Sequence, residues 1–227
     1  MSDRAVERLG AASGLVGVVL GPIGFSLFGS SAIGQSLNSG SKESLAAAIA
    51  APAPAQAFLG TSLDVLSSCL LIVFAARLWA RLRKAEGNPG WLSMAAMAGF
   101  VLGIAGSLAD KIAFSALDAQ AGHGLQVQEA TTLRDVAMVS ANLGFLYIGL
   151  LFLGCAAAVG LRAHAFPRWL SWSAAAIAIV NLVSLLVPPT INFPRLGFPL
   201  LFLWLLAVSL FMLIRPGTRP VVTRSPV

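Results

Sequence analysis

The chain has 227 residues, of which 57% are hydrophobic and only 11% are charged. Because soluble domains carry about 25% charged residues, this composition excludes an ordinary soluble domain and predicts an integral membrane protein. The formal net charge of +6 would favour nucleic acid as a partner, but the basic residues mark alternate loops of a membrane protein. We therefore expect the lipid bilayer as the partner and no nucleic acid.

Six apolar stretches follow one another along the chain, each near the ~20 residues that an α-helix needs to cross the hydrocarbon core. They cover residues 9–30, 58–78, 91–117, 136–161, 169–187 and 196–214. The sequence therefore predicts an all-α, polytopic membrane helix bundle with six transmembrane helices, in a single membrane domain over residues 1–227. The short, basic segment 217–227 is expected to be a flexible tail.

Two of these stretches carry small residues at helical spacing. The first has Gly10, Gly14, Gly17, Gly21 and Gly24, and the third has Gly99, Gly103 and Ser107. Small residues on one stripe allow two membrane helices to approach closely, so we expect both stripes to pack directly against a neighbouring helix. Pro22 has no backbone N–H and predicts a kink in the first helix.

The connection between the first and second stretches, residues 31–57, is the longest in the chain. Its segment KESLAAAIAAPAPAQ is rich in alanine and favours a helix until Pro52 and Pro54 interrupt it. Two interpretations of this loop are open: a helix that lies along the membrane surface, or a plain linker.

The basic residues are distributed unevenly between the two sides of the predicted bundle. Eleven lie before the first stretch, after the second, between the fourth and fifth, or after the sixth, whereas only Lys42 and Arg195 lie in the alternate loops. Cytoplasmic loops carry the excess of Lys and Arg, so we expect both termini in the cytoplasm and a multi-pass protein of the cell membrane. The eleven residues are Arg4, Arg8, Arg77, Arg81, Arg83, Lys84, Arg162, Arg168, Arg215, Arg219 and Arg224.

Two segments of the chain are similar to a known family. RAVERLGAASGL near the start and LGCAAAVGLRAHAFPRWLSW around the fourth loop resemble a bacterial family of six-helix integral membrane proteins that is catalogued as a domain of unknown function. The residues that carry the resemblance are Arg8, the glycines after it, Gly154, Gly160 and the turn Phe166-Pro167-Arg168. The resemblance implies a six-helix membrane fold and no particular reaction.

Asp64 is a carboxylate deep inside the second stretch. It lies 14 residues before Leu78, so at a rise of ~1.5 Å per residue it is roughly 21 Å from the cytoplasmic face and ~9 Å below the outer face of a ~30 Å core. A charge at the membrane centre costs about 2.5–3.5 kcal/mol even on lenient scales, so we expect Asp64 to face the bundle. Thr61, Ser67 and Ser68 share its helical face and can solvate it.

Other polar or irregular positions fall at the depth of Asp64 or nearer the outer face. Those at the same depth are Gly21, Pro22, Tyr147 and Asn181; those above it are Ser26, Asp110, Lys111 and Asn142; and those at the outer boundary are Glu129, Arg134 and Asp135. One interpretation is a polar funnel that opens to the outside and ends at Asp64. Its ligand-binding residues are then Asp64, Thr61, Ser68, Asp110, Lys111, Asn142, Tyr147 and Asn181, with Arg134 and Asp135 at the mouth. The other interpretation is that these residues are unrelated, and that each one separately makes polar contacts with a neighbouring helix.

The adjacent Asp110 and Lys111 decide the state of Asp64. By helical rise they lie roughly 28 and 30 Å from the cytoplasmic end of their stretch, where they are also compatible with an ordinary interfacial pair. If Lys111 or Arg134 reaches Asp64, its carboxylate is ionised. If neither does, we expect a protonated carboxyl group that is hydrogen-bonded to the hydroxyl of Thr61, Ser67, Ser68 or Tyr147.

No nucleotide-binding loop, zinc-binding helix or nucleophile elbow is present in the sequence, and Cys69 and Cys155 fit no metal-ligand spacing, so we assign no cofactor, metal or catalytic residue. Three functions stay open. The first is binding or transport of a proton or small amphiphilic ligand through the funnel. Because the chain is small for a transporter, this function favours a homodimer. The second is a helper subunit that packs against another membrane protein through its glycine stripes. The third is a membrane-embedded enzyme for a lipid or isoprenoid substrate, with Asp64 as general acid.

Overall fold

The computed structural model describes residues 3–31, 34–36, 42–50, 55–186 and 194–214, and over these residues it is helical without any strand. The helices are α1 (Asp3–Gly29), α3 (Lys42–Ile49), α4 (Ala55–Glu86), α5 (Trp91–Gln120), α6 (Val127–Leu146), η1 (Tyr147–Phe152), α7 (Leu153–Ala163), α8 (Arg168–Leu186) and α9 (Pro194–Ile214). The predicted all-helical architecture is confirmed. The predicted tail at 217–227 and the prolines at 52 and 54 lie outside the described residues.

Four helical segments of the described chain are long and apolar enough to cross a membrane. They are Ala5–Gly29, Ala55–Glu86, Trp91–Gln120 and the continuous segment Val127–Ala163 formed by α6, η1 and α7. Their outward faces are apolar: α6, for example, exposes Val136, Val139 and Leu143 in one row. Such a row is what a bilayer would cover, and the chain is therefore compatible with an integral membrane protein.

The fifth and sixth predicted stretches are also helices, α8 and α9, and residues 199–214 of α9 form a shorter apolar helix. That these two helices cross the membrane, which would make six spans in all, stays a prediction.

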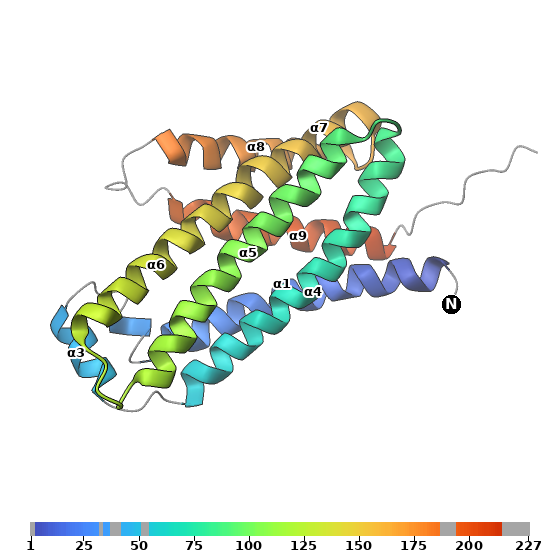
Figure 1. Cartoon of the computed structure of the whole chain (residues 1–227). Coiled ribbons are helices and arrows are strands. Elements are labelled where there is room, and N and C mark those ends of the chain that lie inside the picture. Colours follow the sequence, from blue (N-terminus) through green and yellow to red (C-terminus); the bar gives the residue numbers. More distant parts are fainter. Residues whose placement is uncertain (1–2, 32–33, 37–41, 51–54, 187–193, 215–227) are drawn as a thin grey trace, which may run out of the picture.

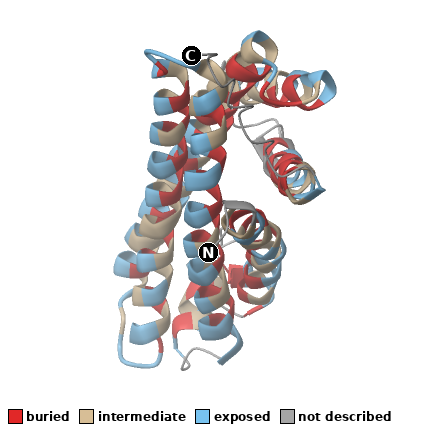
Figure 2. Ribbon diagram, turned by 90° about the vertical axis from the view of Figure 1, so that its right-hand side faces the viewer, coloured by how far each residue is buried: buried red, intermediate tan, exposed pale blue. Residues whose placement is uncertain are grey.

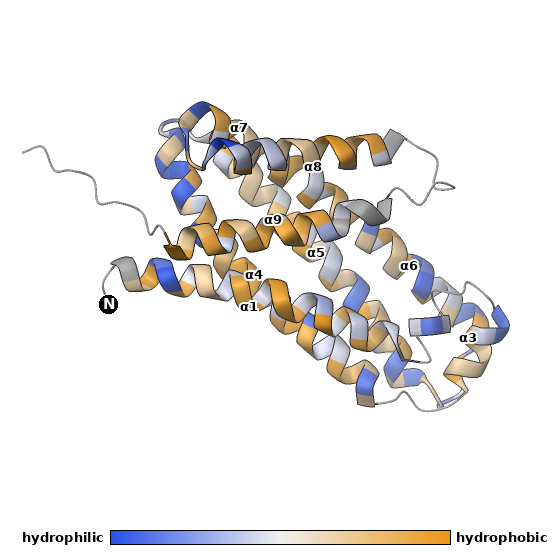
Figure 3. Cartoon of the chain, turned by 180° about the vertical axis from the view of Figure 1, so that it is seen from behind, coloured by the Kyte–Doolittle hydropathy of each residue, from blue (hydrophilic) through white to orange (hydrophobic). Residues whose placement is uncertain are grey.

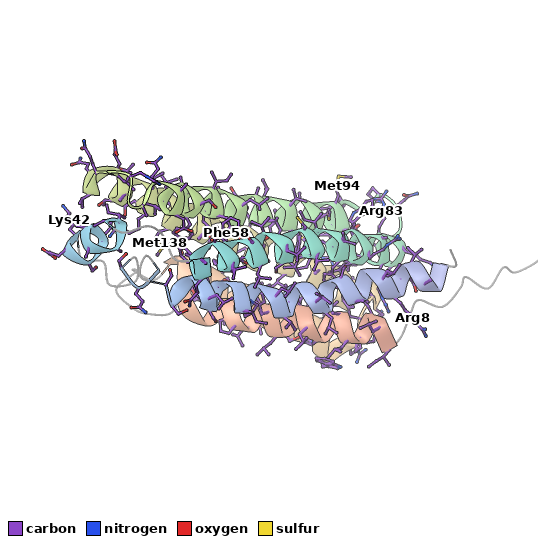
Figure 4. The ribbon with its side chains drawn as sticks, turned by 90° about the horizontal axis from the view of Figure 1, so that it is seen from below. Arg8, Lys42, Phe58, Arg83, Met94 and Met138 are labelled. Atoms are coloured by element: carbon purple, nitrogen blue, oxygen red, sulfur yellow. The ribbon has the colours of Figure 1, made fainter. Side chains whose placement is uncertain are left out.

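Successive long helices run in alternating directions, so their connections gather at two ends (Figure 1). One end holds the turns 87–90 and 164–167, together with the start of α1 and the end of α9. The opposite end holds α3 and the turn 121–126. Figure 4 shows Arg8 and Arg83 at the first end and Lys42 at the other. We refer to them below as the basic end and the α3 end.

Each long helix packs against its neighbours around a shared core. α4 lies between α1 and α5, α9 contacts α1 and α8, and α7 contacts α8 and α5. Buried residues lie on the faces where these helices meet, and exposed residues lie outside (Figure 2). The core contains edge-on aromatic pairs: the ring centroids of Phe100 and Phe152 are 5.1 Å apart, and those of Phe152 and Trp204 are 5.8 Å apart. Trp204 Nε1 also donates to Leu170 O at 2.9 Å, which joins α9 to α8.

The glycine stripe of α1 packs on α4, as its spacing predicts. All five glycines are buried, and a Cβ atom added at Gly24 would lie 2.7 Å from Gly60 O and 2.9 Å from the backbone N of Asp64. One helical turn beyond Asp64 on α4, Ser67 Oγ donates to Gly17 O of α1 at 2.7 Å. Only glycine allows the backbones to approach this closely, and α1 continues through Pro22 as one helix.

The second small-residue stripe, on α5, faces the long helix α6–η1–α7. A Cβ at Gly99 would lie 2.8 Å from the backbone N of Phe152, and one at Gly103 would lie 2.9 Å from Gly144 O. At this contact the helix widens into the π-helical turn η1, Tyr147–Phe152. A π-helical turn accommodates one surplus residue within an α-helix and is frequent at functional sites.

The loop between α1 and α4 contains the short helix α3, which packs on the bundle. Its Leu45 and Ile49 are buried against Leu117 of α5 and Ala130 of α6. The backbone N of Gly122, in the turn that follows α5, donates to Ile49 O at 2.8 Å. Over residues 42–49 the loop is therefore a cap on the α3 end rather than a plain linker.

Candidate functional site

Three charged side chains meet between α4 and α5 in the half of the bundle nearer the α3 end. Lys111 Nζ lies 2.9 Å from Asp64 Oδ2 and 2.9 Å from Asp110 Oδ1, and it donates to Asp110 Oδ2 at 3.1 Å. The side chains of Asp64, Lys111 and Asp110 are only 17%, 12% and 8% exposed. We refer to these three residues as the ionic cluster.

The ionic cluster depends on the antiparallel packing of α4 and α5. Adjacent residues of a helix do not face each other, so the long Lys111 side chain must turn back to reach its neighbour Asp110. The same ammonium also reaches α4, because Asp64 lies opposite on the packed face. Of the two states expected for Asp64, the structure has the one in which Lys111 reaches the carboxylate.

The charges within the ionic cluster do not balance when all three groups are ionised. Two carboxylates then face one ammonium, which leaves one net negative charge in a low-dielectric environment. Asp110 Oδ1 is buried and, among the described groups, accepts no hydrogen bond, although it lies within ion-pair distance of Lys111 Nζ. Because the ammonium approaches this oxygen without hydrogen-bond geometry, the oxygen keeps a lone pair on which a proton can bind.

The nearby hydroxyl groups bond to the backbone rather than to the Asp64 carboxylate. Thr61 Oγ1 donates to Ala57 O at 3.1 Å, and Ser68 Oγ donates to the backbone carbonyl of Asp64 at 3.0 Å. Ser67 Oγ donates across to α1, as described above. Hydroxyls in helices often bond to a carbonyl one turn earlier. Lys111 is therefore the group that stabilises the charge of Asp64.

The structure does not gather every residue of the predicted funnel. Asn142 and Ser26 are exposed, and Tyr147 is 41% exposed. Asn181 donates to Ile177 O at 2.9 Å. Its amide group packs against Gly149 and Gly197, in the space that a Cβ atom at either glycine would occupy. Within the described residues none of these side chains is hydrogen-bonded to the ionic cluster.

The residues predicted at the mouth pair with each other or cap a helix. Arg134 donates to Asp135 Oδ1 from Nε at 3.0 Å and from Nη2 at 2.9 Å, and the Asp135 side chain is 63% exposed. Glu129 accepts a hydrogen bond from the backbone N of Gln126 at 3.3 Å and so caps the start of α6. Arg134 is therefore engaged on its own helix, and Lys111 remains the cation that Asp64 contacts.

An aromatic pair lies next to the ionic cluster on the side of the α3 end. The Lys111 ammonium is 6.0 Å from the ring centroid of Phe114, one turn further along α5. Phe114 in turn lies 4.8 Å, centroid to centroid, from Phe28 at the end of α1. A cation near an aromatic face is stabilised by the ring quadrupole. The spacing of Phe114 from Lys111 was visible in the sequence, but its contact with Phe28 depends on how α1 packs.

Asp118 is a further carboxylate that sequence reasoning did not single out. It lies two turns beyond Asp110 on α5, and its Oδ1 is buried without a hydrogen-bond partner among the described residues. Depth alone would have placed it outside the membrane core. Over the described chain, no three His, Cys, Asp or Glu side chains are grouped to hold a metal ion.

Comparison of the chain with protein-family models, with curated proteins and with solved structures finds no match. The resemblance to a six-helix membrane family therefore stays an expectation. Function has to be argued from the ionic cluster and its surroundings.

Proposed function

We propose that the chain is a six-span protein of the cell membrane whose ionic cluster takes up and releases a proton on the outer side. The observation that carries the proposal is the position of Lys111 Nζ, 2.9 Å from an oxygen of each of two carboxylates, one buried and one largely shielded. Intramembrane carboxylates paired in this way are typical of proton relays.

The orientation follows from the distribution of basic residues. Eleven of them belong to the segments at the basic end or to the tail, and only Lys42 and Arg195 lie in the alternate loops. The basic end then faces the cytoplasm and α3 faces outward. In this orientation both termini are cytoplasmic, and the ionic cluster lies in the outer half of the membrane.

Charge balance gives the reason for proton uptake. With every group ionised, the ionic cluster carries one net negative charge, which is unfavourable in a hydrocarbon surrounding. One proton on either carboxylate makes the cluster neutral while the Lys111 ion pair with the other carboxylate persists. The ring pair Phe28 and Phe114 lies beside Lys111 on the side of the α3 end, and the Asp64 side chain is 17% exposed, which gives the proton a way to the outside.

Infrared difference spectroscopy of the protein in liposomes tests this proposal. As pH is lowered, the wild type should gain the carbonyl band of a protonated carboxyl group. Both Asp64→Asn and Asp110→Asn should remove the component of that band that appears first as the pH falls, because each leaves a neutral ion pair that takes up a proton only at lower pH. Asp135→Asn, which removes an exposed carboxylate, is the matched control and should keep this first component.

Identical titration of the wild type and both ionic-cluster variants would rule out a proton site. The small, glycine-packed bundle would then be better described as a helper subunit of another membrane protein.

A further inference from the structure

A separate pocket lies at the basic end, far along the chain from the ionic cluster. Its volume is about 360 Å³, and it is lined by Pro167, Trp169, Phe211 and Ile214. It lies between the start of α8 and the end of α9, and all four lining residues are apolar. Trp169 and Ile214 are 61% and 77% exposed, so the pocket opens at the periphery of the bundle and not toward its core. It is an open hollow against which an elongated apolar group can lie.

Two arginines, Arg168 and Arg81, adjoin residues that line this apolar pocket. Arg168 stands between two of its lining residues in the sequence and is exposed. The guanidinium of Arg81 lies 4.8 Å from the ring centroid of Phe211 and also interacts with the carboxylate of Glu7. Figure 3 shows hydrophilic residues where α7 leads into α8, and the largely hydrophobic helix α9 runs below α8 in this view.

The pocket also lies within a belt of tryptophans. Four of the five tryptophans, Trp79, Trp91, Trp169 and Trp172, have exposed side chains on helices at the basic end, whereas Trp204 is in the core. Exposed tryptophans are enriched at the boundary between hydrocarbon and lipid headgroups. The belt places the pocket at the depth where a lipid headgroup meets its acyl chains.

We propose that this pocket binds one molecule of an anionic phospholipid. An acyl chain lies against Trp169, Phe211 and Ile214, and the phosphate lies beside Arg168. Apolar walls with a basic rim at headgroup depth match the chemistry of such a lipid. A protein partner fits less well, because a stable interface buries about 800 Å² on each side and this pocket has four lining residues.

Native mass spectrometry of the intact protein tests the site, with phosphatidylglycerol and phosphatidylcholine added separately at equal concentration. The wild type should retain one phosphatidylglycerol molecule in preference to phosphatidylcholine. Arg168→Gln should lower this retention about fivefold, the contribution of one basic residue near an anionic lipid. Arg168→Lys keeps the charge and should restore most of the binding, which separates a loss of charge from a loss of fold.

Two further variants sharpen the result. Trp169→Ala should weaken retention of both lipids, because it removes part of the apolar wall. Arg162→Gln removes an exposed arginine of α7 that, unlike Arg168, does not adjoin a lining residue, and it should leave retention unchanged. Equal retention of the two lipids by the wild type, or an equal loss in Arg162→Gln and Arg168→Gln, would overturn the proposal. The proton titration of the ionic cluster is independent of either outcome.

Discussion

Lys111 on α5 joins Asp64 on α4 through a contact of 2.9 Å between Nζ and Oδ2. The two residues are 47 positions apart in the sequence, and their contact holds two of the long apolar helices together at one depth. Because Asp110 shares the same ammonium, removing different members of the ionic cluster has unequal consequences.

Lys111→Met should be the most damaging change in the ionic cluster. It leaves buried Asp110 and largely shielded Asp64 without their cation, and breaking a buried pair costs about 3–5 kcal/mol. Asp64→Asn should cost far less, since Lys111 keeps Asp110 as its partner. Thermal unfolding in lipid nanodiscs would measure both, with exposed Lys42→Met as the control. Equal stability of Lys111→Met and the wild type would show that the cation contributes nothing to the fold.

Gly24→Ala should destabilise the contact between α1 and α4. The added Cβ would lie 2.7 Å from a backbone oxygen, Gly60 O, which cannot move aside as a flexible side chain would. We expect a loss of about 1–3 kcal/mol from overpacking.

Gly154→Ala is the matched control for Gly24→Ala, because nothing lies within 4 Å of a Cβ at that position. It should be neutral or stabilising by up to about 1 kcal/mol, since alanine favours the helix over glycine. Denaturation curves that move both variants in the same direction would contradict the close approach of the two backbones.

Glu86→Ala should loosen the start of α5. The Glu86 carboxylate accepts hydrogen bonds from the backbone N of Leu92 at 2.9 Å and of Ser93 at 2.8 Å, and from Ser93 Oγ at 2.7 Å. Loss of such a cap costs about 0.5–2 kcal/mol. Hydrogen exchange at the amides of the first turn of α5 should become faster, whereas the nearby exposed change Lys84→Ala should leave it unaltered.

Cysteine labelling would test the orientation of the bundle. After Cys69 and Cys155 are replaced, a cysteine introduced by Lys84→Cys should react with an impermeant reagent only from the cytoplasmic side. One introduced by His123→Cys, in the exposed turn after α5, should react from outside. Reaction of position 84 with reagent added outside intact cells would invert the topology and place the ionic cluster in the inner half of the membrane.

The helices and their small-residue contacts could be predicted because they depend on local patterns. The start of α5 at Trp91 coincides with the start of an apolar stretch, and the five glycines of α1 lie on one stripe at any helix register. These features need only helical periodicity and the rule that small residues permit close approach.

For the site, only a set of alternative partners for Asp64 could be predicted from the sequence. Whether Lys111 or Arg134 reaches Asp64 depends on how far α5 and α6 slide along α4, and neither periodicity nor depth determines that offset. The packing of α3 on Leu117 and Ala130 was not predictable for the same kind of reason. A short alanine-rich helix can pack on the end of a bundle or lie on a membrane surface, and its sequence does not distinguish the two.

The wide turn η1 has a consequence for how this chain can change over evolution. Gly144, before the turn, faces α5, and Gly149, within the turn, faces Asn181 of α8. One continuous helix therefore packs closely against two neighbouring helices. A single deletion elsewhere in Val127–Ala163 would rotate one flank by about 100° and turn its small residues away from their partners. A deletion within Tyr147–Phe152 would remove the surplus residue and leave both flanks facing as they do. Length variation among descendants of this sequence should therefore be tolerated at this turn before it is tolerated in the helix on either side.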